Sequence, residues 1–593
     1  MKGTNGDESR MRSTLTPESR LADLESMSNE HGLDVLVIGG GVTGAGVALD
    51  AVTRGLRTGI VEAQDWASGT SSRSSKLVHG GLRYLQMLDF HLVHEALTER
   101  DLLITELAPH LVEPVSFLYP LENRVWERAY VGAGVALYDT LASVNGRRRR
   151  ALPIHRHLSR TAMSKHFPDL RHDAAIGAIR YWDASVDDAR LVLTLVRTAA
   201  SYGALTANRT QVVSLTHSSV GAVTGAVVQD LETGTRYTIK ARHVINATGV
   251  WTEETESLAQ SDGGLQVLAS KGIHVVVPRE AIRGDVGLIL QTEKSVLFVI
   301  PWSRYWIIGT TDTPYDFDPT HPVATRADID YLLDHANSVL AKPLTRDDVV
   351  GTWAGLRPLL QPGTKDGTSS AKVSREHTVA SPAPGMTVVA GGKLTTYRVM
   401  AKDAVDFALG ARASALPSIT DRIPLWGAEG LKAVKRQGPA LSARYGWTRA
   451  TFDHLTHRYG SGLSQLLDAV SAQEDLARPL EHAPAYLRAE IHFAATHEQV
   501  MHLEDVMMHR TRLVYEVPNG GLAAAPEIAA IVAAVQGWDD DRVEREIASY
   551  RSRVEADAAA AREPSDQEAI AARASAPDIS PMAALGGSEA NDH

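Results

Sequence analysis

The segment 34–46, DVLVIGGGVTGAG, constrains the fold of this chain more than any other. An apolar run leads directly into Gly39, Gly41 and Gly44, which is typical of a β-strand, a tight turn and the start of a helix. The first glycine permits the turn, the second lets the backbone approach a phosphate, and the third lets the helix pack against the strand. Because a helix N-terminus also offers free N–H groups, the segment predicts a site for a dinucleotide pyrophosphate.

Two further strands support this interpretation over a purely structural strand–turn–helix corner. Residues 58–62 (TGIVE) end in Glu62, about twenty residues after the glycine turn, where an acidic side chain binds ribose hydroxyls. Residues 386–392 (MTVVAGG) form a later strand that ends in Gly391 and Gly392. Ligands lie at the carboxyl ends of strands in an open parallel sheet, so we expect this strand end beside Gly39.

Composition excludes several classes of site and partner. The net charge of −11, from 60 basic and 71 acidic residues, argues against nucleic acid as the main partner. The chain has no cysteine, which rules out disulfides, Cys-ligated zinc, iron–sulfur clusters and a cysteinyl-linked flavin. No apolar run of roughly 18 residues and no signal-peptide core is present, so a cytoplasmic protein without a spanning helix is the default expectation.

The pattern of elements predicts an α/β protein with several domains. Residues 33–112, 180–260 and 372–410 form a nucleotide-binding domain in discontinuous pieces, and 113–179 with 261–371 form an inserted β-rich domain. Residues 411–555 are almost wholly helical. The polar ends, 1–32 and 556–593, are expected to be a disordered leader and a disordered tail. Individual expectations are helices at 91–108, 130–143 and 188–202, and strands at 210–214, 222–228, 235–240, 242–249, 272–277, 286–291, 295–300 and 305–310.

The sequence HEQVMH at 497–502 imitates a zinc motif. Zinc-binding histidines on a helix are four residues apart, whereas a spacing of five places the rings about 140° apart around the helix. We therefore expect helical-surface histidines and no metal site.

Several further segments occur in a fixed order after the opening glycine turn. They are SSKLVHGGLRYL (74–85), ATGVW (247–251), KGIH (271–274), GTTD (309–312), AGLRPL (354–359) and GGKLTTYR (391–398). Together they resemble the FAD-dependent, quinone-linked glycerol-3-phosphate dehydrogenases, within the FAD-dependent oxidoreductases of the D-amino-acid-oxidase type. The resemblance covers roughly residues 33–410 and continues through EDVMMHRTRL (504–513). It implies a Rossmann-like FAD-binding domain, a β-rich substrate domain and an all-α C-terminal domain.

The resemblance also implies roles for individual residues. FAD would be bound non-covalently, and Gly80-Gly81 would let the backbone lie flat against the flavin ring. His274 would act as general base or orient the C2 hydroxyl, Arg357 and Lys393 would hold the substrate phosphate, and Arg83, Tyr84, Thr310 and Thr311 would contact the substrate. The expected cofactor-binding residues are Gly39, Gly41, Gly44, Glu62, Ser75, Lys76, His79, Gly80, Gly81, Thr248, Gly249, Gly392, Leu394 and Thr395.

The expected reaction is oxidation of sn-glycerol 3-phosphate to dihydroxyacetone phosphate, with electrons passed to a membrane quinone. The resembled enzymes associate with membranes without spanning them, which favours contact of Arg147–Arg150 with anionic lipid on the inner face of the cell membrane over a solvated basic loop. A glycerol-3-phosphate oxidase that uses oxygen and a non-catalytic flavin- or NAD-binding sensor are the alternatives. Assembly into a homo-oligomer stays open at this point.

Overall fold

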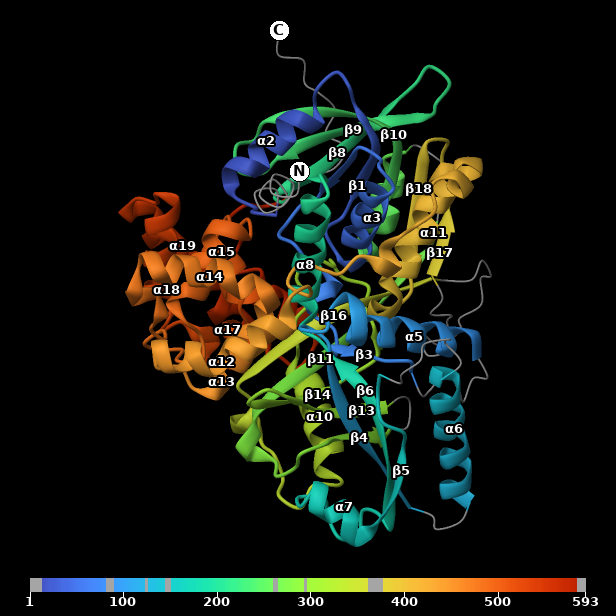
Figure 1. Cartoon of the computed structure of the whole chain (residues 1–593), viewed down its shortest axis with the longest axis vertical. Coiled ribbons are helices and arrows are strands. Elements are labelled where there is room, and N and C mark those ends of the chain that lie inside the picture. The colour runs from blue at the N-terminus through green and yellow to red at the C-terminus, as the bar shows by residue number, and fades with distance from the viewer. Residues whose placement is uncertain are drawn as a thin grey trace.

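The computed structural model of the chain describes residues 13–81, 90–122, 126–143, 151–259, 265–292, 296–360 and 377–583. Two β-sheets follow one another along the longest axis of the molecule, and the C-terminal helices lie to one side of both (Figure 1). The upper sheet contains the N-terminal strand β1, and the lower sheet contains β11 (Figure 1).

The upper sheet is built around β1, which pairs in parallel with β2 and β10 on its two sides. β18 and β7 extend the parallel sheet, and β17 pairs antiparallel at its edge. β9 joins β10 antiparallel, and β8 pairs with β9. The strands are β1 (Leu33–Ile38), β2 (Thr58–Val61), β7 (Leu205–Ala207), β8 (Thr210–His217), β9 (Val223–Asp230), β10 (Arg236–Asn246), β17 (His377–Ala380) and β18 (Met386–Gly391).

The two strands expected at 235–240 and 242–249 form a single strand, β10. Its first half pairs with β9 and its second half pairs with β1, so the pairing continues without the expected break. The strands β8, β9 and β18 confirm the expectations at 210–214, 222–228 and 386–392 within a few residues.

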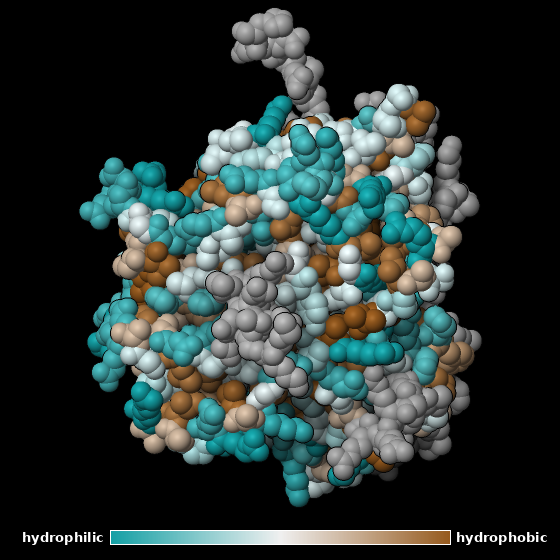
Figure 2. All heavy atoms as spheres, turned by 45° about the horizontal axis from the view of Figure 1, so that its top comes forward, coloured by the Kyte–Doolittle hydropathy of each residue, from teal (hydrophilic) through white to brown (hydrophobic). Residues whose placement is uncertain are grey.

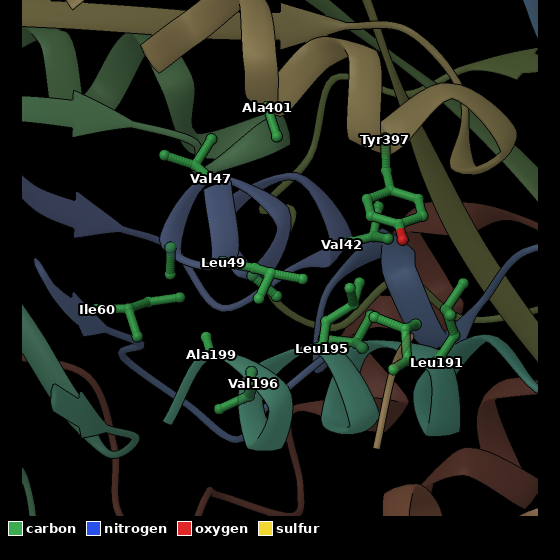
Figure 3. Close-up of a cluster of buried hydrophobic side chains, with 14 of the residues drawn as sticks. Val42, Val47, Leu49, Ile60, Leu191, Leu195, Val196, Ala199, Tyr397 and Ala401 are labelled. Carbon is green, nitrogen blue, oxygen red and sulfur yellow. The ribbon is translucent and has the colours of Figure 1, made fainter. Parts of the chain in front are cut away.

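Three helices cover one face of the upper sheet: α3 (Val42–Thr53), α8 (Asp188–Ser201) and α11 (Tyr397–Leu409). Figure 3 shows Val47, Ile60, Leu195 and Ala401 meeting in the core that these helices form with β2. The side chain of Asp187 caps α8 by accepting a hydrogen bond from Arg190 N at 3.1 Å, as expected of an acidic N-cap.

The lower sheet is mixed and runs in the order β15-β11-β14-β13-β12-β4-β6-β3, with β16 paired to β11 and β5 paired to β6. Helix α10 (Arg326–Asn337) packs its apolar side on this sheet. The strands are β3 (Leu77–Val78), β4 (Glu113–Leu121), β5 (Arg156–Ser159), β6 (Gly177–Ser185), β11 (Val267–Pro278), β12 (Gly287–Gln291), β13 (Val296–Trp302), β14 (Tyr305–Gly309), β15 (Thr313–Pro314) and β16 (Gly351–Leu360).

This sheet takes residues from both sides of the expected domain boundaries. Leu77 and Val78 pair with Ser185 and Ala184, so β3 and the residues 180–185 of β6 belong to the lower sheet rather than to the nucleotide-binding segments. Main-chain pairing across the boundary decides this assignment. Helices around this sheet are α5 (Phe90–Leu102), α6 (Trp126–Ser143), α7 (Arg160–His166) and α10 (Arg326–Asn337), whereas α9 (Thr252–Ser257) packs against β10 of the upper sheet.

The C-terminal part is helical, as expected, and builds its own apolar cores. On the face shown in Figure 2, hydrophilic and hydrophobic residues are interspersed. The helices are α12 (Leu431–Tyr445), α13 (Arg449–Tyr459), α14 (Leu463–Ala472), α15 (Arg488–His497), α16 (Leu503–Asp505), α17 (Leu513–Glu516), α18 (Ala525–Gln536), α19 (Asp540–Ala560) and α20 (Asp566–Arg573).

One segment, Pro518–Gln536, reaches the length and apolar composition of a membrane span, with a mean hydropathy of 1.3. Asn519 and Gly520 have φ angles of 54° and 61°, so the continuous α-helix is the 12-residue α18. Such a helix is about 18 Å long, shorter than a bilayer core of about 30 Å, and its Ile528 and Val532 pack inside the helical core.

The described parts of the leader and the tail, residues 13–32 and 556–583, differ from the expected disorder. In the leader, α2 (Pro17–Met27) begins with a capping box at Thr16 and buries Arg20, which pairs with Asp230. In the tail, α19 continues to Ala560 and α20 follows. Polar composition predicts disorder here, but contacts with distant parts of the chain order these residues.

Candidate active site

The glycine turn after β1 has the geometry that its residues predict. Gly39 has φ of 109°, and a Cβ there would lie 2.7 Å from the carbonyl oxygen of Ala247. A Cβ on Gly44 would lie 1.8 Å from the carbonyl oxygen of Gly39. Gly41 is the N-cap of α3. Only glycine therefore lets β1, β10 and α3 approach this closely.

A cavity of about 260 Å³ opens at the carboxyl ends of the upper-sheet strands. The glycine turn, the end of β2, the end of β10 and the turn after β18 all contribute to its wall, as a topological switch point of a parallel sheet requires. The expected residues that line it are Gly39, Gly41, Glu62, Thr248, Gly249, Gly392, Lys393 and Leu394. Gly44 is outside this wall and acts through the packing of α3 on β1.

Glu62 lines the cavity at the end of β2. Its carboxylate accepts hydrogen bonds from Gly40 N at 2.6 Å and Gln64 N at 2.8 Å, and burial raises its pKa. A carboxylate held in this way keeps acceptor capacity for hydroxyl donors. Its position fits the ribose-binding role that the sequence predicts.

Other wall residues carry no recognisable sequence signal. Ser71 Oγ accepts a hydrogen bond from Val42 N at 2.9 Å and so contacts the first turn of α3. Gln211 enters from β8. The C-terminal residues Met582 and Ala583 also line the cavity. These residues come together only through the tertiary fold, so no local motif identifies them.

A second group of expected residues meets on the lower sheet beside this cavity. β11 pairs with β14 and β16, which places His274 opposite Gly309 and Trp353. Arg357, on β16, donates from Nη2 to Thr310 Oγ1 at 3.0 Å and to the Thr311 carbonyl at 3.1 Å. Arg357 directly precedes Pro358, which lines the cavity. The cluster therefore adjoins the cavity wall that also contains Lys393.

The ring of His274 is held tightly. Its Nε2 lies 2.8 Å from Ser75 Oγ, and the ring stacks on Trp353 with the centroids 5.0 Å apart. Burial, together with the positive charges of Arg357 and Lys76, lowers the pKa of His274 well below its ordinary value. The imidazole is therefore neutral at pH 7 and able to accept a proton.

Several expected cofactor or substrate residues have structural partners instead. Lys76 Nζ is buried and donates to Asp188 Oδ1 at 2.6 Å and to the Ser72 carbonyl at 3.0 Å. The hydroxyl of Thr311 accepts a hydrogen bond from Ile273 N at 3.0 Å, within the strand pairing. These contacts indicate that both side chains build the site rather than face a ligand.

The expected flavin segment at His79–Gly81 lies against Thr395. Thr395 Oγ1 accepts from His79 N at 3.1 Å and donates to its carbonyl at 3.2 Å. A Cβ on Gly80 would meet the hydroxyl of Tyr138 at 2.7 Å, which by itself explains the glycine. Gly81 has φ of 77°. Arg83, Tyr84 and Arg147–Arg150 lie outside the residues that the structure describes.

One cluster has the side chains of a metal site. Ligand atoms of Asp65, Asp505 and His509 lie within 4.8 Å of one another. However, Asp65 pairs with Arg510 and Asp505 pairs with Arg209. These guanidinium groups already balance the carboxylates, so the cluster is an ion-pair network.

The HEQVMH histidines are not on one helix, because α15 ends at His497. His502 is also buried rather than on the surface. It contacts Glu546 through Nδ1 at 2.8 Å and Glu232 through Nε2 at 3.0 Å.

The cavity fits FAD on the observed geometry. The glycines leave no room for side chains near α3, the N-terminus of α3 can receive a pyrophosphate, and Glu62 can accept from ribose hydroxyls. These features are expected of an adenine dinucleotide site in a parallel sheet.

Comparisons with known proteins agree with this geometry. Residues 34–398 match the FAD dependent oxidoreductase family model, and residues 418–543 match the C-terminal domain of alpha-glycerophosphate oxidase. The chain is 49% identical over 567 residues to glycerol-3-phosphate dehydrogenase of Mycobacterium leprae, covering 95% of both chains. It is 36% identical over 561 residues to the human mitochondrial glycerol-3-phosphate dehydrogenase, covering 90% of this chain and 75% of the relative.

A solved structure supports the same assignment. Glycerol-3-phosphate dehydrogenase from Bacillus halodurans, complexed with FAD, superposes with a TM-score of 0.73 at 30% identity, covering 91% of this chain and 98% of the other. The glycine-lined cavity, the two-sheet fold and these relatives lead to one conclusion: the chain belongs to the FAD-dependent glycerol-3-phosphate dehydrogenase family and is an oxidoreductase with FAD as its cofactor.

Proposed function

We propose that this enzyme oxidises sn-glycerol 3-phosphate to dihydroxyacetone phosphate and passes the electrons to a membrane quinone. The observation that carries the substrate assignment is the meeting of His274 and Arg357 on paired strands, next to the cavity wall that contains Lys393. A neutral proton acceptor and fixed positive charge are the two groups that oxidation of a phosphorylated alcohol requires. The names of the relatives support the same substrate.

Arg357 and Lys393 hold the substrate phosphate in this proposal. The guanidinium of Arg357 is oriented by Thr310 and by the Thr311 carbonyl, and its side chain retains 22% exposure. A guanidinium held in one orientation can bind phosphate bidentately. Arg83 and Tyr84 complete the substrate contacts that the resemblance implies.

His274 accepts the proton of the C2 hydroxyl. The ring of His274 packs against Gly309, where a Cβ would lie 2.2 Å from Cδ2, and Ser75 Oγ holds Nε2 in place. The hydroxyl proton moves to Nε2 as the C2 hydrogen leaves with its electron pair. When bound, FAD supplies the acceptor for that hydride. The chain contributes orientation and electrostatics, and FAD is held by the expected cofactor-binding residues that line the cavity: Gly39, Gly41, Glu62, Thr248, Gly249, Gly392 and Leu394.

Anaerobic mixing tests the substrate assignment. Adding glycerol 3-phosphate to the purified holoenzyme without an acceptor should bleach the oxidised flavin absorption, and glycerol should leave it unchanged because it lacks the phosphate. Flavin absorption that stays unchanged with glycerol 3-phosphate would contradict the proposal.

The electron acceptor is either quinone or oxygen. The match of residues 418–543 to the C-terminal domain of alpha-glycerophosphate oxidase keeps the oxidase as a second candidate. Stoichiometric peroxide during turnover supports the oxidase, whereas reduction of a quinone analogue without peroxide supports the dehydrogenase. Membership of an oxidoreductase family favours both candidates over a non-catalytic sensor.

We also propose peripheral contact with the inner face of the cell membrane. Helix α6 leaves Ala133, Ala136 and Leu137 exposed, and the basic run Arg147–Arg150 follows it in the sequence. Apolar side chains next to clustered arginines are expected at an anionic lipid surface.

A further inference from the structure

The end of the described chain reaches the wall of the FAD cavity, which the polar, Ala-rich sequence of the tail does not indicate. Met582 and Ala583 both line the cavity. The N–H of Ala583 donates to Gln211 Oε1 at 2.7 Å, and its carbonyl accepts from Gln211 Nε2 at 2.9 Å. One residue of the tail therefore satisfies both ends of a side-chain amide on β8.

This contact lies at the end of the cavity where Glu62 is found. Thr210, which precedes Gln211, donates its N–H to the carbonyl of Glu62 at 2.8 Å. An acidic residue at the end of the second strand binds the ribose of an adenine dinucleotide. The tail therefore covers the adenylate end of the cavity.

Ser580 fastens the same segment to two other parts of the molecule. Its hydroxyl lies 3.1 Å from Glu232 Oε1 and 3.1 Å from His502 Nε2. Glu232 follows β9 of the upper sheet, and His502 precedes α16 of the helical part. The Ser580 hydroxyl thus connects the tail to both the upper sheet and the helical C-terminal part.

Asp578 fastens the segment to the loop before α10. Asp578 Oδ2 lies 2.8 Å from His321 Nε2, and Arg573 lies 3.8 Å from the other carboxylate oxygen. Helix α20, just before this segment, pairs its Asp566 with the buried Lys271 of β11. The segment is therefore held at several points before it reaches the cavity.

We propose that residues 574–583 form a strap that closes the adenylate end of the FAD cavity and slows FAD release. The strap contributes an apolar side chain, Met582, and the main chain of Ala583 to the wall, while Gln211 serves as its latch. FAD can leave through this end only when the strap detaches. The inference rests on FAD as the cofactor and is independent of the substrate, so its tests do not involve glycerol 3-phosphate.

Truncation is the first test. Removing residues 579–593 deletes Ser580, Met582 and Ala583 but keeps α20 and Asp578. Loss of the two Ala583–Gln211 hydrogen bonds, the two hydrogen-bond contacts of Ser580 and the apolar contact of Met582 should raise the FAD dissociation rate roughly 10-fold or more, measured by the recovery of FAD fluorescence after dilution. Removing only 584–593 is the matched control and should leave that rate unchanged. Equal rates for the 579–593 deletion and the intact chain would overturn the proposal, as would equally fast release from the control.

Point variants keep the test valid if the truncated chain does not fold. Gln211→Glu removes the donor to the Ala583 carbonyl and keeps the side-chain shape, so it should speed FAD release several-fold, as loss of one hydrogen bond implies. Met582→Ala should do the same through lost apolar contact. Ser218→Ala, at a tight turn of the same sheet region, is a control that should release FAD at the wild-type rate. An unchanged rate of FAD release in both Gln211→Glu and Met582→Ala would contradict the proposal.

Hydrogen exchange distinguishes the two ends of the cofactor. Because coupling is reciprocal, a ligand held by the strap must slow exchange of residues 574–583. ADP added to the apoprotein at saturation should slow it, and FMN should not, because FMN lacks the adenylate. Protection by FMN alone, or by neither FAD nor ADP, would overturn the assignment. Residues 431–445 of α12 serve as the internal reference, with the same exchange in every state.

Discussion

Nε2 of His274 lies 2.8 Å from Oγ of Ser75, although the two residues are 199 positions apart. Ser75 lies two residues before β3, and His274 lies on β11 of the same lower sheet. The hydrogen bond therefore joins two distant strands of this sheet at the place where we assign proton transfer.

This contact predicts separable effects of two variants. His274→Asn should lower kcat by about 10² to 10⁴, the range of general-base catalysis, and leave the flavin spectrum intact. Ser75→Ala should lower kcat roughly 5-fold with little change in KM, because it releases the ring but keeps the base. Steady-state kinetics with glycerol 3-phosphate checks both. A His274→Asn enzyme with wild-type kcat would contradict the assigned base.

The pH dependence follows from the charge environment of His274. Burial and the charges of Arg357 and Lys76 lower its pKa well below 6.5, so the neutral base persists as the pH falls below that value. We expect the acid limb of kcat/KM that belongs to this base well below pH 6.5. The prediction fails if the acid limb of the kcat/KM profile is centred near pH 6.5 and disappears in His274→Asn. That result would show that His274 titrates with an ordinary pKa and that its ring is not desolvated during catalysis.

Arg357 should act on substrate binding and not on cofactor binding. Arg357→Ala should raise KM roughly 10- to 150-fold, because hydrogen bonds from charged groups contribute about 1.5–3 kcal/mol. The flavin spectrum and FAD content should remain those of the wild type. Arg422→Ala, which removes a guanidinium with 81% exposure, is the matched control and should have the wild-type KM. Loss of flavin from Arg357→Ala would place this residue in the cofactor site.

His502 predicts a specific change of stability with pH. Burial alone would lower its pKa, but the hydrogen bonds that its ring donates to Glu232 and Glu546 raise the pKa to about 9. A raised pKa stabilises the folded state fully below the unfolded value of about 6.5, and the effect is lost as the pH rises through about 9. The raised pKa of His502 therefore contributes on the order of 3 kcal/mol to the free energy of unfolding at pH values below the unfolded pKa.

Thermal unfolding between pH 6 and 10 measures this linkage. The wild-type Tm should fall over this range by more than the Tm of His502→Gln, which cannot carry the charge. His335→Gln, which removes a partly exposed histidine on α10, should follow the wild type. If Tm changes with pH in the same way in the wild type and in His502→Gln, the interaction of His502 with Glu232 and Glu546 does not control the pH dependence of stability.

The glycine turn gives a prediction on cofactor binding. Gly44→Ala places a Cβ 1.8 Å from the Gly39 carbonyl, so α3 must move away from β1 and FAD affinity should fall by at least about 10-fold. Gly134→Ala, on α6, meets nothing within 4 Å and should retain FAD normally. FAD titration of the two apoproteins compares them. A wild-type FAD affinity in Gly44→Ala would show that the turn accommodates the added Cβ without weakening FAD binding.

Membrane binding should depend on the basic run after α6. Replacing Arg147–Arg150 with glutamates should abolish cosedimentation with anionic vesicles, because each basic residue near such a surface contributes about 1 kcal/mol. Neutral vesicles should bind both proteins weakly. If the variant binds anionic vesicles as well as the wild type does, the run is not the anchor.

Local sequence determined the elements of the cofactor cavity. The glycines, the apolar runs and Asp187 act over a few residues through sterics, periodicity and capping, and the structure confirms the strand, turn and helix starts they predict. Glu62 also lies where its spacing from the turn places it. These features can be predicted from the sequence because their physical causes act between residues that are close together in the chain.

Only the tertiary structure decided which side chains face the site and which support it. Lys76 forms an ion pair with Asp188, Gln211 hydrogen-bonds to the main chain of Ala583, and His502 is buried between two glutamates. Each of these pairs joins residues far apart in the chain, so neither partner's surroundings can be inferred from its neighbours in sequence. The order of residues 13–32 and 556–583 has the same origin, since long-range ion pairs and hydrogen bonds hold segments whose composition alone indicates disorder.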